Sequence, residues 1–201
     1  MTTQDVLAAT VRSIQAIDPE AIDRMANAIV KTRQQGGRLF LVGSGGGAAH
    51  ASHATADFRK LCGLEAYCPS DNAAELTARV NDDGWPTAYL EWLRGSRFNA
   101  SDALLVVSVG GGSLEPPVSE NLVYAMDHAN QLDATTLAIV GRDGGFTGKY
   151  SDVTVLIPCD TPELVTFVVE GVQAVVLHAL VSKLAVKKAK WESIDEGGIS
   201  R

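Results

Sequence analysis

Cysteine is scarce in this chain, which has three in 201 residues: Cys62, Cys68 and Cys159. Their number is odd and none is spaced as a Cys-x-x-Cys pair, so the sequence offers neither a disulfide framework nor a cysteine zinc pattern. No stretch with the features of a secretory signal peptide precedes the first helical pattern. We therefore expect a reducing, cytoplasmic environment and cysteines that act as small core residues.

Long runs of basic or of apolar residues are also missing. The formal net charge is −7 and the pI is near 5.0, which argues against a nucleic-acid-binding surface. The most apolar stretch, residues 164–186, is interrupted by Glu170, Gln173, His178 and Lys183, which favours a buried helix over a membrane span. We therefore expect neither a nucleic-acid nor a membrane partner.

The composition is that of a soluble globular protein, with 46% hydrophobic residues, 20% charged residues and 19 glycines. A chain of this length usually forms one domain. We expect a single domain over residues 1–190, followed by a polar tail over residues 191–201.

Helical and strand patterns alternate along the chain. Residues 3–17 and 19–35 have apolar positions at helical spacing and are separated by a capping Asp18 and Pro19, which predicts a helical hairpin within residues 1–36. Short apolar runs then predict strands over 38–43, 64–70, 102–112, 134–145 and 152–159. Helical patterns follow over 47–60, 118–130 and 161–187.

This alternation predicts an α/β fold with three layers, in which helices cover both faces of a doubly wound parallel sheet. In such sheets ligands bind at the carboxyl ends of the strands. The long C-terminal helix, residues 161–187, is apolar on nearly all sides, so we expect it to pack against another subunit as well as the sheet.

Two glycine-rich loops follow predicted strands. "GSGGGA" begins at residue 43, and "SVGGGS" runs from Ser108 to Ser113. Glycines let backbone N–H groups approach an anion closely, so two such loops at one sheet edge could hold one phosphate. A plain tight turn is an alternative for the first loop. It also fits a dinucleotide fingerprint, but the acidic residue that such a site needs is only loosely matched by Asp71.

His53 and Asp57 are four residues apart in the helix predicted after the first loop, hence on one face of it, with His50 on the same side. This pair could be half of a metal site or an acid/base pair. An ordinary i,i+4 ion pair is the alternative interpretation.

Glu170 and His178 stand among valines and leucines in the long C-terminal helix. They are about two turns apart and can point to similar regions. A carboxylate in so apolar a helix is costly to bury unless it is paired, metal-bound or functional. A core histidine and glutamate that satisfy each other are the alternative.

Three further polar residues have ordinary explanations. His128 lies near the end of a predicted helix, where a capping or solvent-facing role suffices. Asn81 and Asp82, in "NDDGW", can start a turn or cap a helix that begins near Trp85.

Four segments in order resemble the SIS (sugar isomerase) domain, and within it the phosphoheptose isomerases. "VGSGGGAAHASHATADF" is similar to that family's G-N-G-G-S loop and H-x-x-x-E helix, and "SVGGGS" to its S-T-S-G-N-S phosphate loop. "NDDGW" resembles its N-D-x-G segment, and "EGVQAVVLH" its late Q-x-x-H-x-x-x-x-H helix. The resemblance spans nearly the whole chain, including the helical N-terminus.

The resemblance implies an aldose–ketose isomerase that acts on a phosphorylated sugar, such as sedoheptulose 7-phosphate, through an enediol. It implies acid/base roles for Asp57 and His178, a cluster of His53, Asp57, Glu170 and His178 that can bind zinc, and a homotetramer. The residues implied to bind substrate are Ser44, Gly45, Gly46, Asp82, Ser108, Gly110, Gly111, Gly112, Ser113 and Glu170.

The sequence departs from the family pattern at several of these places. Asp57 replaces a glutamate and Glu170 a glutamine, while the second loop has lost polar side chains at Val109, Gly110 and Gly112. Residues 114–121, "LEPPVSEN", resemble an insertion that reshapes the entrance. The weakened loop and the shorter carboxylate motivate one alternative, a non-catalytic module that binds sugar phosphate. A nicotinamide-dependent oxidoreductase is a further hypothesis.

Overall fold

The computed structural model describes residues 1–186. The predicted domain end at residue 190 and the polar tail 191–201 therefore lie outside the described residues. The α-helices are α1 (Thr3–Gln15), α2 (Pro19–Gln34), α3 (Gly46–Cys62), α4 (Ala73–Asp82), α5 (Ala88–Gly95), α6 (Glu120–Gln131), α7 (Gly145–Tyr150) and α8 (Val165–Leu184), with 3-10 turns η1 (Pro69–Asp71) and η2 (Pro162–Leu164). The strands are β1 (Leu39–Gly43), β2 (Ala66–Tyr67), β3 (Ala103–Ser108), β4 (Ser113–Leu114), β5 (Pro117–Val118), β6 (Thr135–Val140) and β7 (Val153–Leu156).

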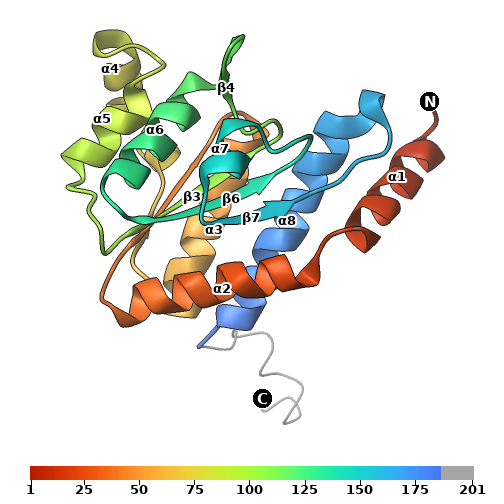
Figure 1. The fold of residues 1–201 in the computed structure, drawn as a ribbon, viewed down its shortest axis with the longest axis horizontal. Coiled ribbons are helices and arrows are strands. Elements are labelled where there is room, and N and C mark those ends of the chain that lie inside the picture. Colours follow the sequence, from red (N-terminus) through yellow and green to blue (C-terminus); the bar gives the residue numbers. More distant parts are fainter. Residues whose placement is uncertain (187–201) are drawn as a thin grey trace, which may run out of the picture.

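Five of these strands form one parallel sheet with the order β2-β1-β3-β6-β7 (Figure 1). β1 and β3 are buried along their whole length, as expected for a parallel sheet covered on both faces. The predicted doubly wound α/β fold is confirmed.

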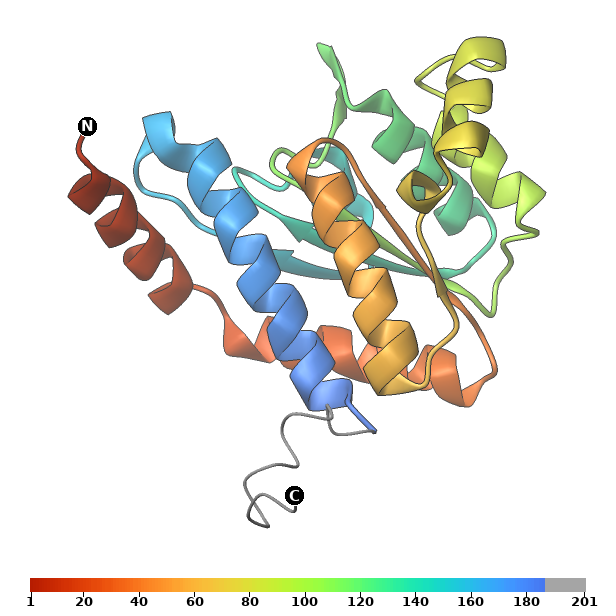
Figure 2. The same ribbon diagram turned by 180° about the vertical axis from the view of Figure 1, so that it is seen from behind.

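The side chains of the central strands alternate between two cores. Leu39 and Leu41 point into the core under α2, α3 and α8, whereas Phe40 and Val42 point into the core under α5 and α6. Figure 2 shows α3 and α8 side by side on the first face, with α1 next to α8. The alternation with period two along each strand thus produces the three layers.

Strand order reverses between β1 and β3. The chain leaves β1 through α3 to reach β2 on one side, and leaves β3 through α6 to reach β6 on the other. The two connecting helices therefore cover opposite faces, which opens a crevice at the carboxyl ends of β1 and β3. Both glycine loops of the sequence lie at this point.

The N-terminal helices begin where their caps predict. Thr2 and Asp5 form a capping box at the start of α1, and the Asp18 side chain accepts the Glu20 N–H at the start of α2. Both helices pack against α8, and Figure 1 shows them splayed rather than as two parallel rods. The predicted helices are present, but α8 rather than a close hairpin contact holds them.

The long C-terminal helix passes a test of length and composition for a membrane span. Within Pro162–Leu184, a window of 18 residues has a mean hydropathy of 2.0, and half of that window is buried inside the structure. The buried side faces α1, α2 and α3. The core helix of a soluble protein is equally apolar, because it is buried by packing of this kind. This helix alone is therefore weak evidence for a membrane span.

Some elements differ from the sequence-based expectation. α4 and α7 were not predicted, and α5 begins at Ala88 rather than near Trp85. The strands expected to end at residues 112 and 145 end at Ser108 and Val140, because the glycines after each leave the sheet to form loops. The insertion-like segment 114–121 forms most of the β4–β5 hairpin and the start of α6.

Candidate active site

The first glycine loop, residues 43–47, is packed tightly between β1, α3 and β3 at its two ends, Gly43 and Gly47. A Cβ at Gly47 would lie 2.3 Å from the Val107 carbonyl oxygen, and one at Gly43 would lie 2.4 Å from the Gly47 carbonyl carbon. Neither backbone can move aside cheaply. These glycines are therefore required by the close approach of α3 to the sheet, whatever the loop binds.

The carboxylate of Glu170 lies directly over this first loop. A Cβ at Gly46 would fall 2.5 Å from Glu170 Cδ and 2.7 Å from each carboxylate oxygen. Gly46 is the first residue of α3, where a negative charge is favourable beside the positive end of the helix. The first loop thus faces a negatively charged side chain of the protein.

The second glycine loop, residues 108–113, is held from behind by the chain that follows β6. The Gly141 N–H donates to the Val109 carbonyl at 3.0 Å, the Phe146 N–H to Gly112 at 2.8 Å, and the Thr147 N–H to Gly111 at 2.9 Å. These bonds occupy carbonyl oxygens of the loop. The N–H groups of Gly110 and Gly112 donate no hydrogen bond within residues 1–186.

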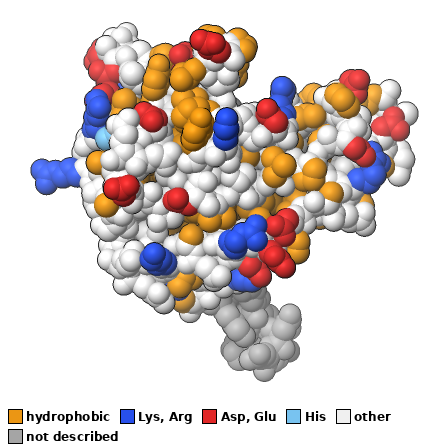
Figure 3. All heavy atoms as spheres, in the orientation of Figure 1, with side chains coloured by type: hydrophobic (Ala, Val, Ile, Leu, Met, Phe, Trp, Pro, Cys, Tyr) orange, Lys and Arg blue, Asp and Glu red, His pale blue; other side chains and the backbone are white. Residues whose placement is uncertain are grey.

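A cleft of about 1460 Å³ opens beside the second loop. It runs from Ser44 and Ser108 across α7 to the ends of β7 and the start of α8, with the β4–β5 hairpin as one wall. In Figure 3 the upper outline of the molecule is notched between this hairpin and the start of α8. The cationic and acidic residues of its lining are Glu115, Arg142, Asp143 and Lys149.

The serines of the second loop differ in what they can still donate. Ser108 Oγ accepts the Gly111 N–H at 3.1 Å, which leaves its own hydrogen available. Ser113 Oγ donates to the Glu115 carbonyl at 3.0 Å and accepts the Glu115 N–H at 3.1 Å. The hydroxyl of Ser113 thus stabilises the turn of the hairpin.

Ser44 is oriented by a buried amide. Asn121 is fully buried at the start of α6, and its Nδ2 donates to Ser44 Oγ at 3.2 Å. A hydroxyl that accepts this bond can donate its own hydrogen elsewhere, and Ser44 lines the cleft. Asn121 Oδ1 has no partner within the described residues.

Tyr89 fixes the first loop from the other face of the sheet. Its hydroxyl donates to the Gly43 carbonyl at 2.6 Å. Burial raises the pKa of Tyr89 to about 12, against smaller lowering effects from hydrogen bonds with Ser44 and Asn121. Tyr89, Ser44 and Asn121 therefore form one polar network behind the cleft.

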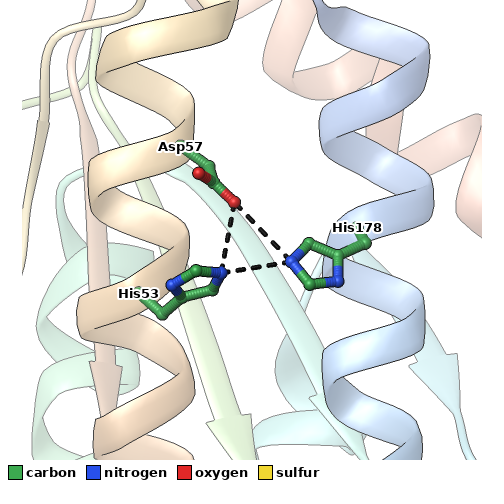
Figure 4. A group of neighbouring side chains, drawn as sticks. All are labelled: His53, Asp57 and His178. Atoms are coloured by element: carbon green, nitrogen blue, oxygen red, sulfur yellow. Dashed lines mark hydrogen bonds and ion pairs between the residues drawn. The ribbon is translucent and has the colours of Figure 1, made fainter. Parts of the chain in front are cut away.

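Three side chains converge between α3 and α8 (Figure 4). His53 Nε2 lies 3.3 Å from Asp57 Oδ2 and 3.1 Å from His178 Nε2, and His178 Nε2 lies 3.7 Å from the same carboxylate oxygen. One ligand atom of each lies within 4.8 Å of the other two. The two histidines are about three-fifths exposed and Asp57 is one-fifth exposed. The group is thus open to a ligand.

A second polar contact lies on the same helices, nearer the glycine loop. His50 Nδ1 is 3.2 Å from Oε1 of the fully buried Gln173, whose Nε2 has no partner within the described residues. Helices α3 and α8 run side by side in the same direction (Figure 2). From their N-terminal ends onward, the pairs are Gly46 with Glu170, His50 with Gln173, and His53 with His178. A polar seam thus connects the first loop to the His53–Asp57–His178 group.

The fold brings together most of the residues singled out in the sequence, but not all. Glu170 belongs to the top of the seam and not to the group of potential metal ligands. Asp82 ends α4, accepts a hydrogen bond from Asn81 at 2.6 Å, and does not line the cleft. His128 lies in the last turn of α6, where burial lowers its pKa. Asp71 accepts a hydrogen bond from Ser52.

The sequence-based reasoning missed several polar residues of the site, because each depends on a long-range contact. Asn121 and Tyr89 are far from Ser44 in the chain and carry no motif of their own. Arg142, in "VGRDGG", lies at the carboxyl end of a predicted strand, and this position is a signal that could have identified it.

Comparisons with known proteins identify the family of this chain. The family model described as "SIS domain" matches residues 4–141. The chain is 34% identical over 172 residues to the lincomycin biosynthesis protein LmbN of Streptomyces lincolnensis, covering 81% of this chain and 61% of that protein. It therefore spans less than two thirds of that relative.

Two phosphoheptose isomerases are covered more completely. The one from Chlorobaculum parvum is 32% identical over 148 residues, which are 70% of this chain and 68% of that protein. The solved structure of the one from Neisseria gonorrhoeae superposes with a TM-score of 0.75 at 26% identity, covering 91% of this chain and 98% of that one. The resemblance found in the sequence is confirmed.

Proposed function

The chain belongs to the SIS domain family, and from this premise we propose that it is a phosphosugar isomerase. The reaction is the interconversion of an aldose and a ketose phosphate, such as sedoheptulose 7-phosphate. The observation that carries the proposal is the meeting of a carboxylate and two imidazoles between α3 and α8, on the helix that begins at the first glycine loop. Phosphoheptose isomerases among the relatives support the substrate class.

The reaction moves one proton between adjacent carbons and another between their oxygens. In the direction from aldose to ketose, a base removes the proton on C2, the electron pair forms the enediol, and a proton returns to C1. Asp57 is suited to be the base that removes the proton from carbon, because His53 Nε2 lies 3.3 Å from its Oδ2 and orients the carboxylate. His178 suits the transfer between the oxygens, since imidazole can both give and accept a proton near neutral pH.

The donor set of the group fits zinc. Two imidazole nitrogens and one carboxylate oxygen are the ligands of many catalytic zinc sites, which use three protein ligands and leave one position open. We propose that His53, Asp57 and His178 would hold the ion, which when bound would polarise a carbonyl oxygen. Glu170 is left out of this set because its carboxylate lies against Gly46.

We also propose a cytoplasmic homotetramer. The described surface exposes apolar side chains on neighbouring helices: Leu7, Val11 and Ile14 on α1, and Phe167 and Val175 on α8. Their burial in an assembly would account for a helix that is apolar on nearly all sides. The three cysteines are all free, which suits a reducing compartment.

The test follows solvent deuterium in the sugar. The protein, with and without zinc, is incubated in D₂O with sedoheptulose 7-phosphate and a panel of other ketose and aldose phosphates, and incorporation at C1 and C2 is measured by NMR. We expect incorporation with at least one sugar, and a fall of about 10²–10⁴-fold in Asp57→Asn and His178→Ala. The control variants Asp127→Asn and His128→Ala, on α6, should exchange at the wild-type rate.

Two outcomes would contradict isomerase activity. If no sugar of the panel exchanges while one of them raises the melting temperature, the protein is a binding module that has lost the chemistry. If a nicotinamide dinucleotide raises the melting temperature and no sugar phosphate does, the first loop serves a dinucleotide instead.

A further inference from the structure

Arg142 is a cation without a partner in the cleft beside the second loop. It follows β6 and lines the cleft together with Ser108 and Ser113. Within residues 1–186 its guanidinium makes no hydrogen bond and no ion pair. The acidic neighbour Asp143 turns toward the backbone instead, where its Oδ1 accepts the Gly145 N–H at 3.3 Å.

The arginine side chain lies against the open side of the glycine loop. A Cβ at Gly110 would be 3.7 Å from Arg142 Cδ and 4.0 Å from its Nε, and would have no other contact within 4 Å. The Gly141 N–H donates to the Val109 carbonyl at 3.0 Å, which joins the residue before Arg142 to the residue before Gly110. The side chain of Arg142 therefore lies within reach of any anion that binds at Gly110.

The loop itself supplies only neutral donors. Those still available are the N–H groups of Gly110 and Gly112 and the hydroxyls of Ser44 and Ser108, because the Ser113 hydroxyl is used by Glu115. A phosphate ester carries about −1.5 to −2 charges at neutral pH. The first loop cannot supply the missing positive charge, since the Glu170 carboxylate lies against it.

We propose that Arg142 is the residue that recognises the phosphate of the substrate, by pairing its guanidinium with the anion held on Gly110 and Gly112. The inference rests on the proposed function for the nature of the substrate. Arginine suits this role because its planar fork can donate two parallel hydrogen bonds to phosphate oxygens. A phosphate-binding Arg142 also explains why the loop can have glycine at positions 110 and 112, where the family loop carries side-chain donors.

The backbone at Arg142 allows a test that separates binding from folding. Its φ is +53°, in the left-handed region that favours glycine, and Arg97 has the same φ of +53° after α5, outside the cleft. Replacing either arginine by glycine removes the side chain and relieves the backbone. Both variants should melt at or above the wild-type temperature, so weaker binding in one of them cannot be ascribed to unfolding.

The experiment measures the dissociation constant of inorganic phosphate by titration calorimetry and, separately, KM and kcat for the sugar phosphate that the wild type isomerises. We expect Arg142→Gly to raise both the dissociation constant and KM about 10- to 100-fold with little change in kcat. Arg142→Lys should be intermediate, because it keeps the charge and loses the fork. Arg97→Gly should match the wild type in all three constants.

The outcomes separate this inference from the proposed function. A dissociation constant for phosphate in Arg142→Gly within twofold of the wild type, or no phosphate binding by the wild type itself, would overturn the role of Arg142. If phosphate binding depends on Arg142 but no sugar phosphate is isomerised, the role of Arg142 stands and the proposed reaction fails. If a sugar is isomerised with the same KM in Arg142→Gly, the reaction stands and the inference fails.

Discussion

The two glycine loops have similar sequences and lie at the same edge of the sheet, yet their surroundings are opposite. In the first, Gly43 and Gly47 touch backbone on both sides and Gly46 faces the Glu170 carboxylate. In the second, Gly110 faces open space bordered only by Arg142. At Gly46 the first loop thus faces a negative charge of the protein, whereas at Gly110 the second loop faces open space and a positive charge.

This difference shows that glycine has more than one reason to occur in such loops. Gly47 is needed because two backbones approach each other, and Gly111, with φ of +71°, because an added Cβ would meet the Gly144 carbonyl oxygen at 1.8 Å. Neither constraint applies to Gly110, so the binding of a ligand is the remaining reason for a residue without a side chain at this position. Substitutions along the two loops should therefore separate stability from binding.

The largest expected effect is that of Gly47→Ala in the first loop. The new methyl group would lie 2.3 Å from the Val107 carbonyl oxygen, so α3 must move away from the sheet. We expect a loss of about 3 kcal/mol or more in the free energy of unfolding. Thermal and denaturant unfolding measure this loss.

Gly171→Ala is the matched control for that substitution. Gly171 lies in α8, and a Cβ there would meet nothing within 4 Å. Alanine should leave the stability unchanged or raise it by up to about 1 kcal/mol through its higher helix propensity. Equal stability of the two variants would show that close packing of the first loop does not require glycine.

Asn121→Asp should have the next largest effect on stability. It should also weaken phosphate binding at the second loop, because Asn121 orients Ser44. The variant puts a carboxylate in a fully buried position and removes the Nδ2 donor to Ser44 Oγ. We expect a loss of about 2–3 kcal/mol at pH 7 and weaker phosphate binding.

The pH dependence of Asn121→Asp supplies its own control. Burial raises the pKa of the introduced carboxyl above its value in the unfolded chain. The folded state therefore regains stability relative to the wild type as the pH falls and the carboxyl becomes neutral. A loss of stability that is equal at pH 4 and pH 8 would contradict the burial of this side chain.

The sequence was sufficient for the fold because its strongest signals are local. The apolar runs that became β1, β3 and β6 and the caps at Thr2 and Asp18 act over a few residues. The short helix α4 was missed although Asn72 caps it, accepting the Glu75 N–H at 3.2 Å, because its residues bury no side chain and give no core pattern.

The site was only partly predictable, because its contacts join distant segments. The spacing of His53 and Asp57 indicated one helix face, and the family resemblance added His178, which the structure brings within 3.7 Å of Asp57. Nothing local indicated that Asn121 contacts Ser44, that Glu170 covers Gly46, or that the Ser113 hydroxyl is used by Glu115. These contacts depend on strand order and helix packing, which a single sequence does not encode in any short motif.

Tyr89→Phe tests how far the first loop depends on its anchor. The variant removes the hydrogen bond from the Tyr89 hydroxyl to the Gly43 carbonyl and keeps the ring in the core. We expect a loss of about 1 kcal/mol at pH 7, measured by denaturant unfolding.

The same variant should change the response to alkali. The pKa of Tyr89 is raised to about 12 by burial, so the unfolded state releases this proton first as the pH rises above about 10. The stability that the wild type owes to the neutral phenol is present below pH 10 and is lost between about pH 10 and 12. Tyr89→Phe should lack this part of the alkaline loss. Identical alkaline profiles would show that the hydroxyl ionises freely in the folded protein.

Glu170→Gln should have the smallest effect on stability and sharpens the contrast between the loops most directly. It removes the negative charge beside Gly46 at the start of α3, which should cost about 0.3–1 kcal/mol through the helix dipole. If the second loop alone holds the phosphate, the dissociation constant for inorganic phosphate should change less than about threefold, since only a screened charge at a distance is removed. A much tighter complex would mean that the first loop also contacts the anion and that Glu170 opposes it. The dissociation constants of phosphate for Glu170→Gln and Arg142→Gly, measured in one titration series, therefore decide between two arrangements. Either the second loop alone binds the phosphate, or both loops bind it.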